Sequence, residues 1–166
     1  MRGYLITFAV ALLLGLAGGV ALGIFVYPYI FLADIVATEK VQPAAQGQPE
    51  RKVLARGAFI HANPSDPIHW GKGSVTVYDG LLHLEPDFEV GPGPKYHVYL
   101  VPEKDVVPST NVARTMFVDL GRLKAFKGSQ NYEVPAGLDF KRYPSVVIWC
   151  EQFGVLISPA KLTASQ

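Results

Sequence analysis

Hydrophobic and polar positions divide the chain into an uncharged apolar leader and a longer part in which the two kinds alternate. No charged residue occurs in positions 3–33. A helix rises about 1.5 Å per residue, so this segment is long enough to cross a hydrocarbon core of about 30 Å. Beyond it, apolar and polar residues alternate between turn residues, as is typical of β-strands. We predict a transmembrane signal-anchor helix in residues 1–33, a flexible linker in 34–55 and a β domain in 56–166.

Two interpretations of the leader differ in whether it is removed. Tyr4 at one end and Tyr27 and Tyr29 at the other fit the aromatic belts of a membrane-spanning helix. A cleaved signal peptide is the alternative, with Arg2 as its short positive region. The apolar run continues through residues 24–27, beyond the usual 7 to 15 apolar residues of a signal peptide. This length favours an uncleaved anchor.

Glycines recur at every fourth position of the leader. Gly15, Gly19 and Gly23 would lie on one helix face, where a second backbone could approach closely. We therefore treat self-association through this helix as a hypothesis. The alternative is that glycine is simply common in membrane helices.

The linker prediction comes from composition. Residues 38–50 are rich in Gln, Pro, Ala and Gly and have no apolar periodicity, so they cannot build a core. We expect an extended tether.

The clearest element of the β domain is a hairpin in residues 73–84. Asp79-Gly80 fits a type I′ turn, which would pair Val75 with Leu84 on one face. His83 would then be a half-exposed residue on the opposite face.

Further short strands follow at similar spacing, with Gly and Pro between them. They are predicted at residues 57–61, 96–101, 117–123, 131–134, 145–150 and 155–158. About eight short strands predict an all-β fold, an antiparallel β-sandwich or barrel-like domain preceded by one transmembrane helix.

The segment 145–150 ends on the only cysteine, Cys150. It is apolar on both faces, which indicates a central strand. Alternation places Ile148 and Cys150 on one face and Trp149 and Glu151 on the other. A lone cysteine cannot form an intramolecular disulfide, so Cys150 is either a packed core residue or a reactive thiol.

Charge excludes one class of partner. Residues 56–166 contain equal numbers of acidic and basic residues. Phosphate binding needs a basic face, so no nucleic-acid partner is expected.

Cofactor chemistry is limited by the spacing of the ligands. There is no C-x-x-C-H sequence, so c-type haem attachment is excluded. His61, His69, His97, Met116 and Cys150 are the residue types of a copper site, yet no His or Met follows the cysteine closely. Zinc is disfavoured because the histidines lack ligand-pair spacing. No metal site is predicted, while noncovalently held haem stays open.

Supporting residues for a redox cysteine can be named, although no catalytic residue is assigned and we lean against an enzyme. His69 and His97 are the candidates for a Cys–His pair, whose geometry the sequence does not give. Trp149 and Glu151 flank Cys150 in the chain.

Several stretches of the domain resemble the DM-thirteen domain family, an electron-transfer domain often found beside DOMON domains. They are LGRLK at 120–124, GSQNYEVP at 128–135 and YPSVVIWCEQF at 143–153. Gly57-x-Phe59 and the segment 97–100 agree as well. The resemblance covers nearly all of the domain.

The resemblance implies an all-β, extracytoplasmic domain in which the cysteine matching Cys150 has a redox role. That role is as a bare thiol or as ligand to a prosthetic group. This chain carries no DOMON neighbour, so its redox or protein partner is unidentified. The alternative function is a noncatalytic binding or adhesion module in which the cysteine only packs.

Localisation follows in part from the resemblance. Arg2 precedes the helix while Lys40, Arg51 and Lys52 follow it, so the positive charges do not decide the orientation. We expect a single-pass membrane protein whose C-terminal domain is extracytoplasmic, in the periplasm or at the cell exterior.

Overall fold

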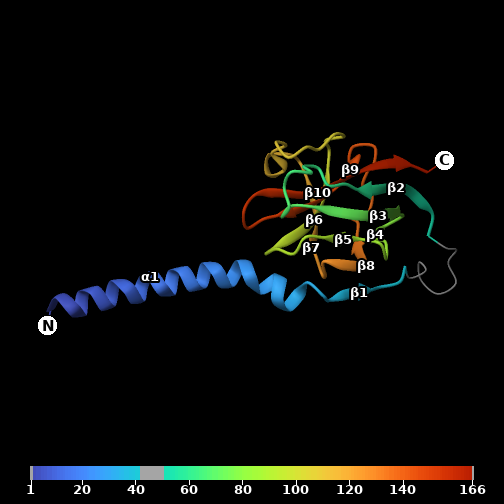
Figure 1. Cartoon of the computed structure of the whole chain (residues 1–166). Helices are drawn as coiled ribbons and strands as arrows, with labels where there is room; N and C mark the ends of the chain where they lie inside the picture. The colour runs from blue at the N-terminus through green and yellow to red at the C-terminus, as the bar shows by residue number, and fades with distance from the viewer. Residues whose placement is uncertain (1, 42–50, 166) are drawn as a thin grey trace.

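The computed structural model describes residues 2–41 and 51–165 and places a long N-terminal helix beside a β domain (Figure 1). Helix α1 spans Arg2–Tyr27 and continues as the short π-helix η1, Pro28–Leu32. By length and composition, the segment Gly3–Leu32 could cross a membrane, a test that a signal sequence also passes. Pro28 lies where α1 passes into η1, and because it has no N–H to donate, the regular hydrogen bonding of the α-helix is interrupted there.

The described strands form one ten-stranded sheet, ordered β1-β8-β4-β3-β2-β10-β9-β6-β7, with β5 beside β3 and β8. All its pairings are antiparallel except that of β1 with β8. The predicted all-β domain after one apolar helix is confirmed. The strands are β1 Val36–Thr38, β2 Val53–Phe59, β3 Gly71–Tyr78, β4 Leu81–Leu84, β5 Glu89–Val90, β6 Tyr96–Val101, β7 Val118–Arg122, β8 Lys127–Glu133, β9 Ser145–Cys150 and β10 Val155–Ala164; the 3-10 helix η2 covers Val112–Arg114.

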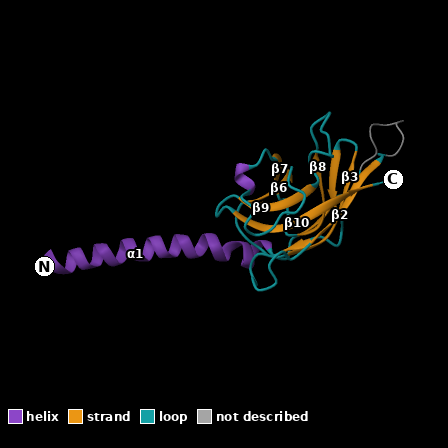
Figure 2. Cartoon of the chain, turned by 90° about the horizontal axis from the view of Figure 1, so that it is seen from above, coloured by secondary structure: helices purple, strands orange, loops and turns teal. Residues whose placement is uncertain are grey.

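The sheet curls around a single main core (Figure 2). Side chains from β3, such as Val77, and from β6, such as Val98, belong to one buried cluster although three strands separate them in the sheet. A flat sheet could not bring them together, so the strands wrap around the cluster. Phe88, from the turn before β5, fills the same core and is packed edge to face against Phe59.

Strand β9 is covered on both faces, as its apolar sequence predicts. It lies between β6 and β10. Ile148 and Cys150 point into the main core, whereas Val147 and Trp149 belong to a second cluster on the other side of the sheet. The whole strand is buried, which makes it the central element of the domain.

The hairpin of β3 and β4 has the predicted register but a different turn. Val75 pairs with Leu84, as expected. A type I′ turn needs two residues with positive φ, and here only Gly80 has one, at +71°. The type I′ prediction is therefore wrong. The Asp79 N–H donates to the carbonyl of Lys52, which holds the first turn residue against the segment that leads into β2.

His83 is buried rather than half-exposed, and that prediction is also wrong. Only 5% of the residue is accessible, and its Nδ1 lies 2.7 Å from Oδ1 of Asn131. The segment after the helix lies beside this face, since the side-chain amide of Asn131 donates to the carbonyl of Lys40.

Part of the segment predicted as a linker is attached to the sheet. Strand β1 runs parallel to β8, and the Glu39 N–H donates to the Ser129 carbonyl. The Glu39 carboxylate accepts hydrogen bonds from Lys124 Nζ at 2.8 Å and from the Asn131 N–H at 2.8 Å. These contacts fix the exit of the helix beside the domain. Residues 42–50, the rest of that predicted tether, lie outside the described residues, and the domain boundaries themselves stay predictions.

Glycine at position 128 permits the attachment of β1. Its φ is +86°, and an added Cβ would collide with the carbonyl oxygen of Ala37 in β1. We predict that Gly128→Ala displaces β1 from β8, in addition to the cost of about 1–2 kcal/mol for an L-residue in the left-handed region. The measurement is hydrogen exchange on the full chain in detergent, where the Glu39 amide should lose protection.

Gly137→Ala is the matched control. Gly137 also has a positive φ, +78°, but an added Cβ would meet nothing within 4 Å. It should carry the same backbone strain and leave the Glu39 amide protected. Equal loss of protection in both variants would contradict a role of the close approach.

Self-association of the helix can also be tested by substituting a glycine. Gly15, Gly19 and Gly23 have open space around them in the single chain, as does Gly18, which lies on a different helix face. If Gly19 is the contact point, Gly19→Ile should reduce the oligomeric state in membranes or detergent, because its side chain keeps the second backbone away. Gly18→Ile is the control, and an unchanged oligomeric state in Gly19→Ile would refute the hypothesis.

Candidate functional site

Cys150 lies at the end of β9, in register with Tyr96 of β6 and Val155 of β10. Its exposure is 1%, and its Sγ donates to the carbonyl oxygen of Pro94 at 3.3 Å. The thiol is therefore a buried strand-end group under the loop that leads into β6.

Burial raises the pKa of the Cys150 thiol above its ordinary value. The backbone N–H groups of Phe153 and Gln152, in the turn after β9, act in the opposite direction, and the charge of Glu151 adds to the increase. The net direction keeps the sulfur in its protonated, unreactive form. Phe153 itself is 53% exposed, so its ring does not bury the turn after β9.

The loop of residues 91–95 covers the thiol and is tightly fitted. Any Cβ on Gly93 would collide with the hydroxyl of Tyr96. Lys95 has a φ of 51°, the one positive φ among the described non-glycine residues, and its carbonyl accepts from the Glu151 N–H. A backbone held in this sparsely populated region depends on its surroundings, so the cover is a specific conformation rather than a loose loop.

On the opposite face of the sheet, His97 and Glu151 come together. His97 Nε2 lies 3.5 Å from the Glu151 carboxylate, and its Nδ1 lies 3.1 Å from Asp119. Glu151 also accepts a 2.6 Å hydrogen bond from the Tyr99 hydroxyl and pairs with Lys95 Nζ at 3.2 Å. Two of the predicted supporting residues thus form one polar cluster, together with Asp119, Tyr99 and Lys95.

This cluster has the donor set of a divalent-cation site. Ligand atoms of His97, Asp119 and Glu151 all lie within 4.8 Å of one another. The ammonium group of Lys95 already supplies a cation to Glu151, so the arrangement is complete as an ion-pair network. Cys150 is not part of the group, because successive residues of a strand point to opposite faces.

The other sequence candidates lie elsewhere. His69 Nδ1 is 2.6 Å from the carboxylate of Asp66, and His61 Nε2 is 2.8 Å from the Asp66 carbonyl oxygen. Hydrogen bonds from the His69 side chain and from the backbone N–H groups of Ile68 and His69 lower the pKa of Asp66 to about 2. His69 is thereby engaged in its own loop.

Trp149 is 5% exposed and packs in the second cluster with Tyr99, whose ring stacks on Phe117 at 4.2 Å. The residues considered for copper are not gathered, since Met116 is 70% exposed and His61 is bonded within its own loop.

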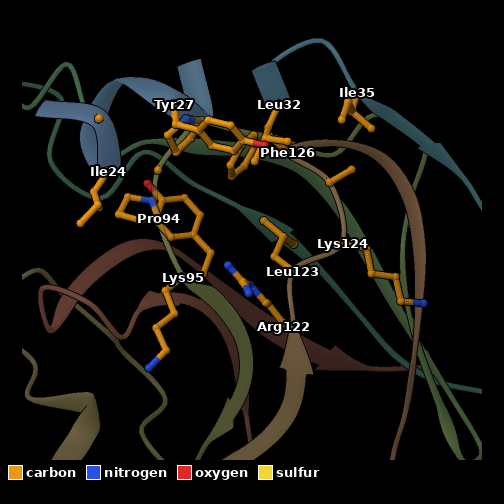
Figure 3. Close-up of a pocket in the computed structure, with 15 residues that line it drawn as sticks. Ile24, Tyr27, Leu32, Ile35, Pro94, Lys95, Arg122, Leu123, Lys124 and Phe126 are labelled. Atoms are coloured by element: carbon orange, nitrogen blue, oxygen red, sulfur yellow. The ribbon is translucent and has the colours of Figure 1, made fainter. Parts of the chain in front are cut away.

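A cavity of about 880 Å³ lies between the end of the helix and the β domain (Figure 3). Ile24, Tyr27 and Leu32 of the helical segment face Leu123 and Phe126 of the domain across it. Pro94 and Tyr96, the residues next to Cys150, form part of its wall.

The described arrangement does not fit a prosthetic group ligated by Cys150. The cysteine is absent from the cavity lining, and its sulfur is directed at the Pro94 carbonyl inside the core. A group in the cavity would meet Pro94 and Tyr96 before it reached the sulfur.

Sequence reasoning missed Asp119, Tyr99 and Lys95. The β6–β7 pairing has an irregularity between His97 and Tyr99, and such shifts redirect side chains. The only signal in the sequence is strand alternation, which places Tyr99 on the same face of β6 as His97.

A family model described as electron transfer DM13 matches residues 64–162. No curated protein and no solved structure matches the chain. The matched segment runs from the loop before β3 into β10 and includes Cys150, His69, His97 and Glu151.

The Glu151 network makes a pH-dependent contribution to stability. The Tyr99 hydrogen bond is the largest cause of the lowered pKa of Glu151; burial opposes it, and Lys95 and His97 act with it. A carboxyl whose folded pKa is lowered stabilises the fold above its unfolded pKa of about 4.3 and loses that effect as pH falls through the folded value. We predict that Glu151→Gln costs about 1 kcal/mol at neutral pH and less at about pH 3.

The measurement is urea unfolding of the full chain in detergent at both pH values. Glu133→Gln is the control, because Glu133 is an exposed strand residue for which the described part of the chain contains no ion pair. A Glu151→Gln effect of equal size at both pH values would contradict the electrostatic origin.

Proposed function

This chain belongs to the electron transfer DM13 family, and on that premise we propose that its β domain transfers electrons at a membrane surface, with Cys150 as the redox group. The family match carries the proposal, because it spans most of the domain and includes the strand that ends on this cysteine. The partner that gives or takes the electrons is unidentified.

The membrane location is part of the proposal. The segment Gly3–Leu32 has the length and apolar composition of a membrane span, and β1 holds its exit against the domain. We propose that the helix is an uncleaved anchor and that the domain lies on the extracytoplasmic side. Substrates and partners would then approach a domain held close to the bilayer.

Cys150 would act as a bare thiol that becomes reactive only when its cover opens. The closed form protects it, since it is 1% exposed and its pKa is raised. Movement of the loop 91–95 would remove the Pro94 carbonyl and admit water to the sulfur. The N–H groups of Gln152 and Phe153 lower the pKa of the thiol, and they would favour a thiolate once water reaches it.

A noncatalytic binding or adhesion module is the second candidate. The observation in its favour is the same burial, because a fully packed protonated cysteine behaves as a small core residue. The two functions differ in whether the thiol is ever exposed without unfolding of the domain.

Alkylation of Cys150 by a maleimide distinguishes them. The full chain in detergent is treated in low concentrations of urea, and the alkylated fraction is followed by mass spectrometry. If the cover opens locally, the reaction should be slow and nearly independent of urea, because little new surface is exposed. A rate that rises with urea as steeply as global unfolding would overturn the redox proposal and favour a structural cysteine.

Gly93→Ala should increase the alkylation rate, because its Cβ collides with the Tyr96 hydroxyl and forces the cover open. Gly57→Ala is the matched control, since its Cβ would also be too close, at 2.7 Å from the Lys161 carbonyl, but in β2 and away from the loop. A visible spectrum and metal analysis of the same sample identify any sulfur-bound group, which would block alkylation for a different reason.

A further inference from the structure

The cavity at the helix exit combines apolar walls with a cationic side chain. Its volume of about 880 Å³ lies within the range of about 300–1,000 Å³ that is usual for ligand pockets. The helical segment contributes Ile24, Tyr27 and Leu32, and Ile35 follows it just before β1. One wall is thus made by the proposed membrane anchor itself.

Three cationic residues line the cavity, but two of them are already paired. Lys95 Nζ lies 3.2 Å from Glu151, and Lys124 Nζ lies 2.8 Å from Glu39. Figure 3 shows the Lys95 and Lys124 side chains pointing away, while the guanidinium group of Arg122 points into the cavity.

Arg122 is the cation that lacks a carboxylate. It is exposed, and no ion pair or side-chain hydrogen bond to it occurs in residues 2–41 and 51–165. Its five N–H donors form a planar fork that suits a phosphate. An occupant with an anionic head and an apolar body would match both the charge and the walls.

The position of the cavity matches the level of lipid headgroups. A hydrocarbon core of about 30 Å takes about 20 helical residues. A helix that enters at Tyr4 would therefore leave the core near Ile24, which lines the cavity together with Gly23 and Tyr27. Its mouth would lie in the interfacial layer of that membrane.

We propose that this cavity binds an anionic phospholipid of the surrounding membrane, whose phosphate is held by Arg122 and whose acyl chain lies between the helix and the domain. The proposal rests on the membrane anchoring put forward above, and it adds a ligand that electron transfer does not require. A free phosphate shares the headgroup chemistry but would leave the apolar walls unused, so the lipid is the better match.

The test uses the full chain in nanodiscs of phosphatidylcholine that contain a minor fraction of phosphatidylglycerol. Native mass spectrometry of the released protein measures which lipid is retained. We expect phosphatidylglycerol to be enriched over its share of the disc, and Arg122→Gln to reduce the enrichment about tenfold, because a charge-assisted hydrogen bond to the phosphate is lost.

A matched control accompanies Arg122→Gln, and a second pair of variants tests the apolar wall. Arg114→Gln removes the same charge from the exposed turn η2, outside the cavity, and should leave the enrichment unchanged. Ile35→Asn changes an exposed cavity residue and should reduce retention of both lipids, whereas Ile60→Asn, at a similarly exposed position outside the cavity, should not.

Equal retention of the two lipids, or equal effects of Arg122→Gln and Arg114→Gln, would overturn the proposal. Displacement of the lipid by millimolar inorganic phosphate would indicate that the site binds free phosphate rather than a membrane lipid. This result would also overturn the phospholipid proposal. Alkaline extraction tests the anchor separately: a chain released from membranes without detergent refutes the anchoring, whereas a retained chain without lipid preference refutes only the lipid site.

Discussion

Burial of β9 on both faces is the constraint on which the domain depends. The strand lies between β6 and β10, so its inward residues complete the main core and its outward residues complete the second cluster. Neither cluster can form without it. The same arrangement places Cys150 in the core and Glu151 on the outer face, one residue apart but in opposite chemical surroundings. A sulfur in the core and an ion-pair network outside it are thus consequences of one strand.

The parts of the fold that the sequence predicts are those that follow from local alternation of apolar and polar residues. The hairpin register and the central position of β9 follow from alternation within a few residues, and both are present. The pairing of β1 with β8 could not be predicted, because a three-residue strand is too short to show a periodicity, and Gly128 matters only once β1 is beside it. Likewise, Asp119 reaches His97 through an irregularity in the pairing of β6 with β7, which tertiary packing determines.

The attachment of the segment after the helix to the β domain is a second constraint on the structure. Glu39 neutralises Lys124 and at the same time accepts the Asn131 N–H, so the segment after the helix is bound through both charge and backbone. This leaves Arg122 as the unpaired cation among the three basic residues described around the cavity. Charge pairing on the domain therefore decides where an anion can bind.

The cavity and the thiol are coupled through one wall. Pro94 covers the sulfur of Cys150 on one side and lines the cavity on the other, and Tyr96 is in register with Cys150 while it faces the same cavity. Any occupant that contacts Pro94 in its closed position stabilises the cover and so disfavours exposure of the thiol. Because such coupling is reciprocal, exposure of the thiol must weaken binding in the cavity by the same factor. On the proposals of a cavity ligand and of a cover that opens, ligand binding and thiol reactivity would then be two measurements of one loop equilibrium.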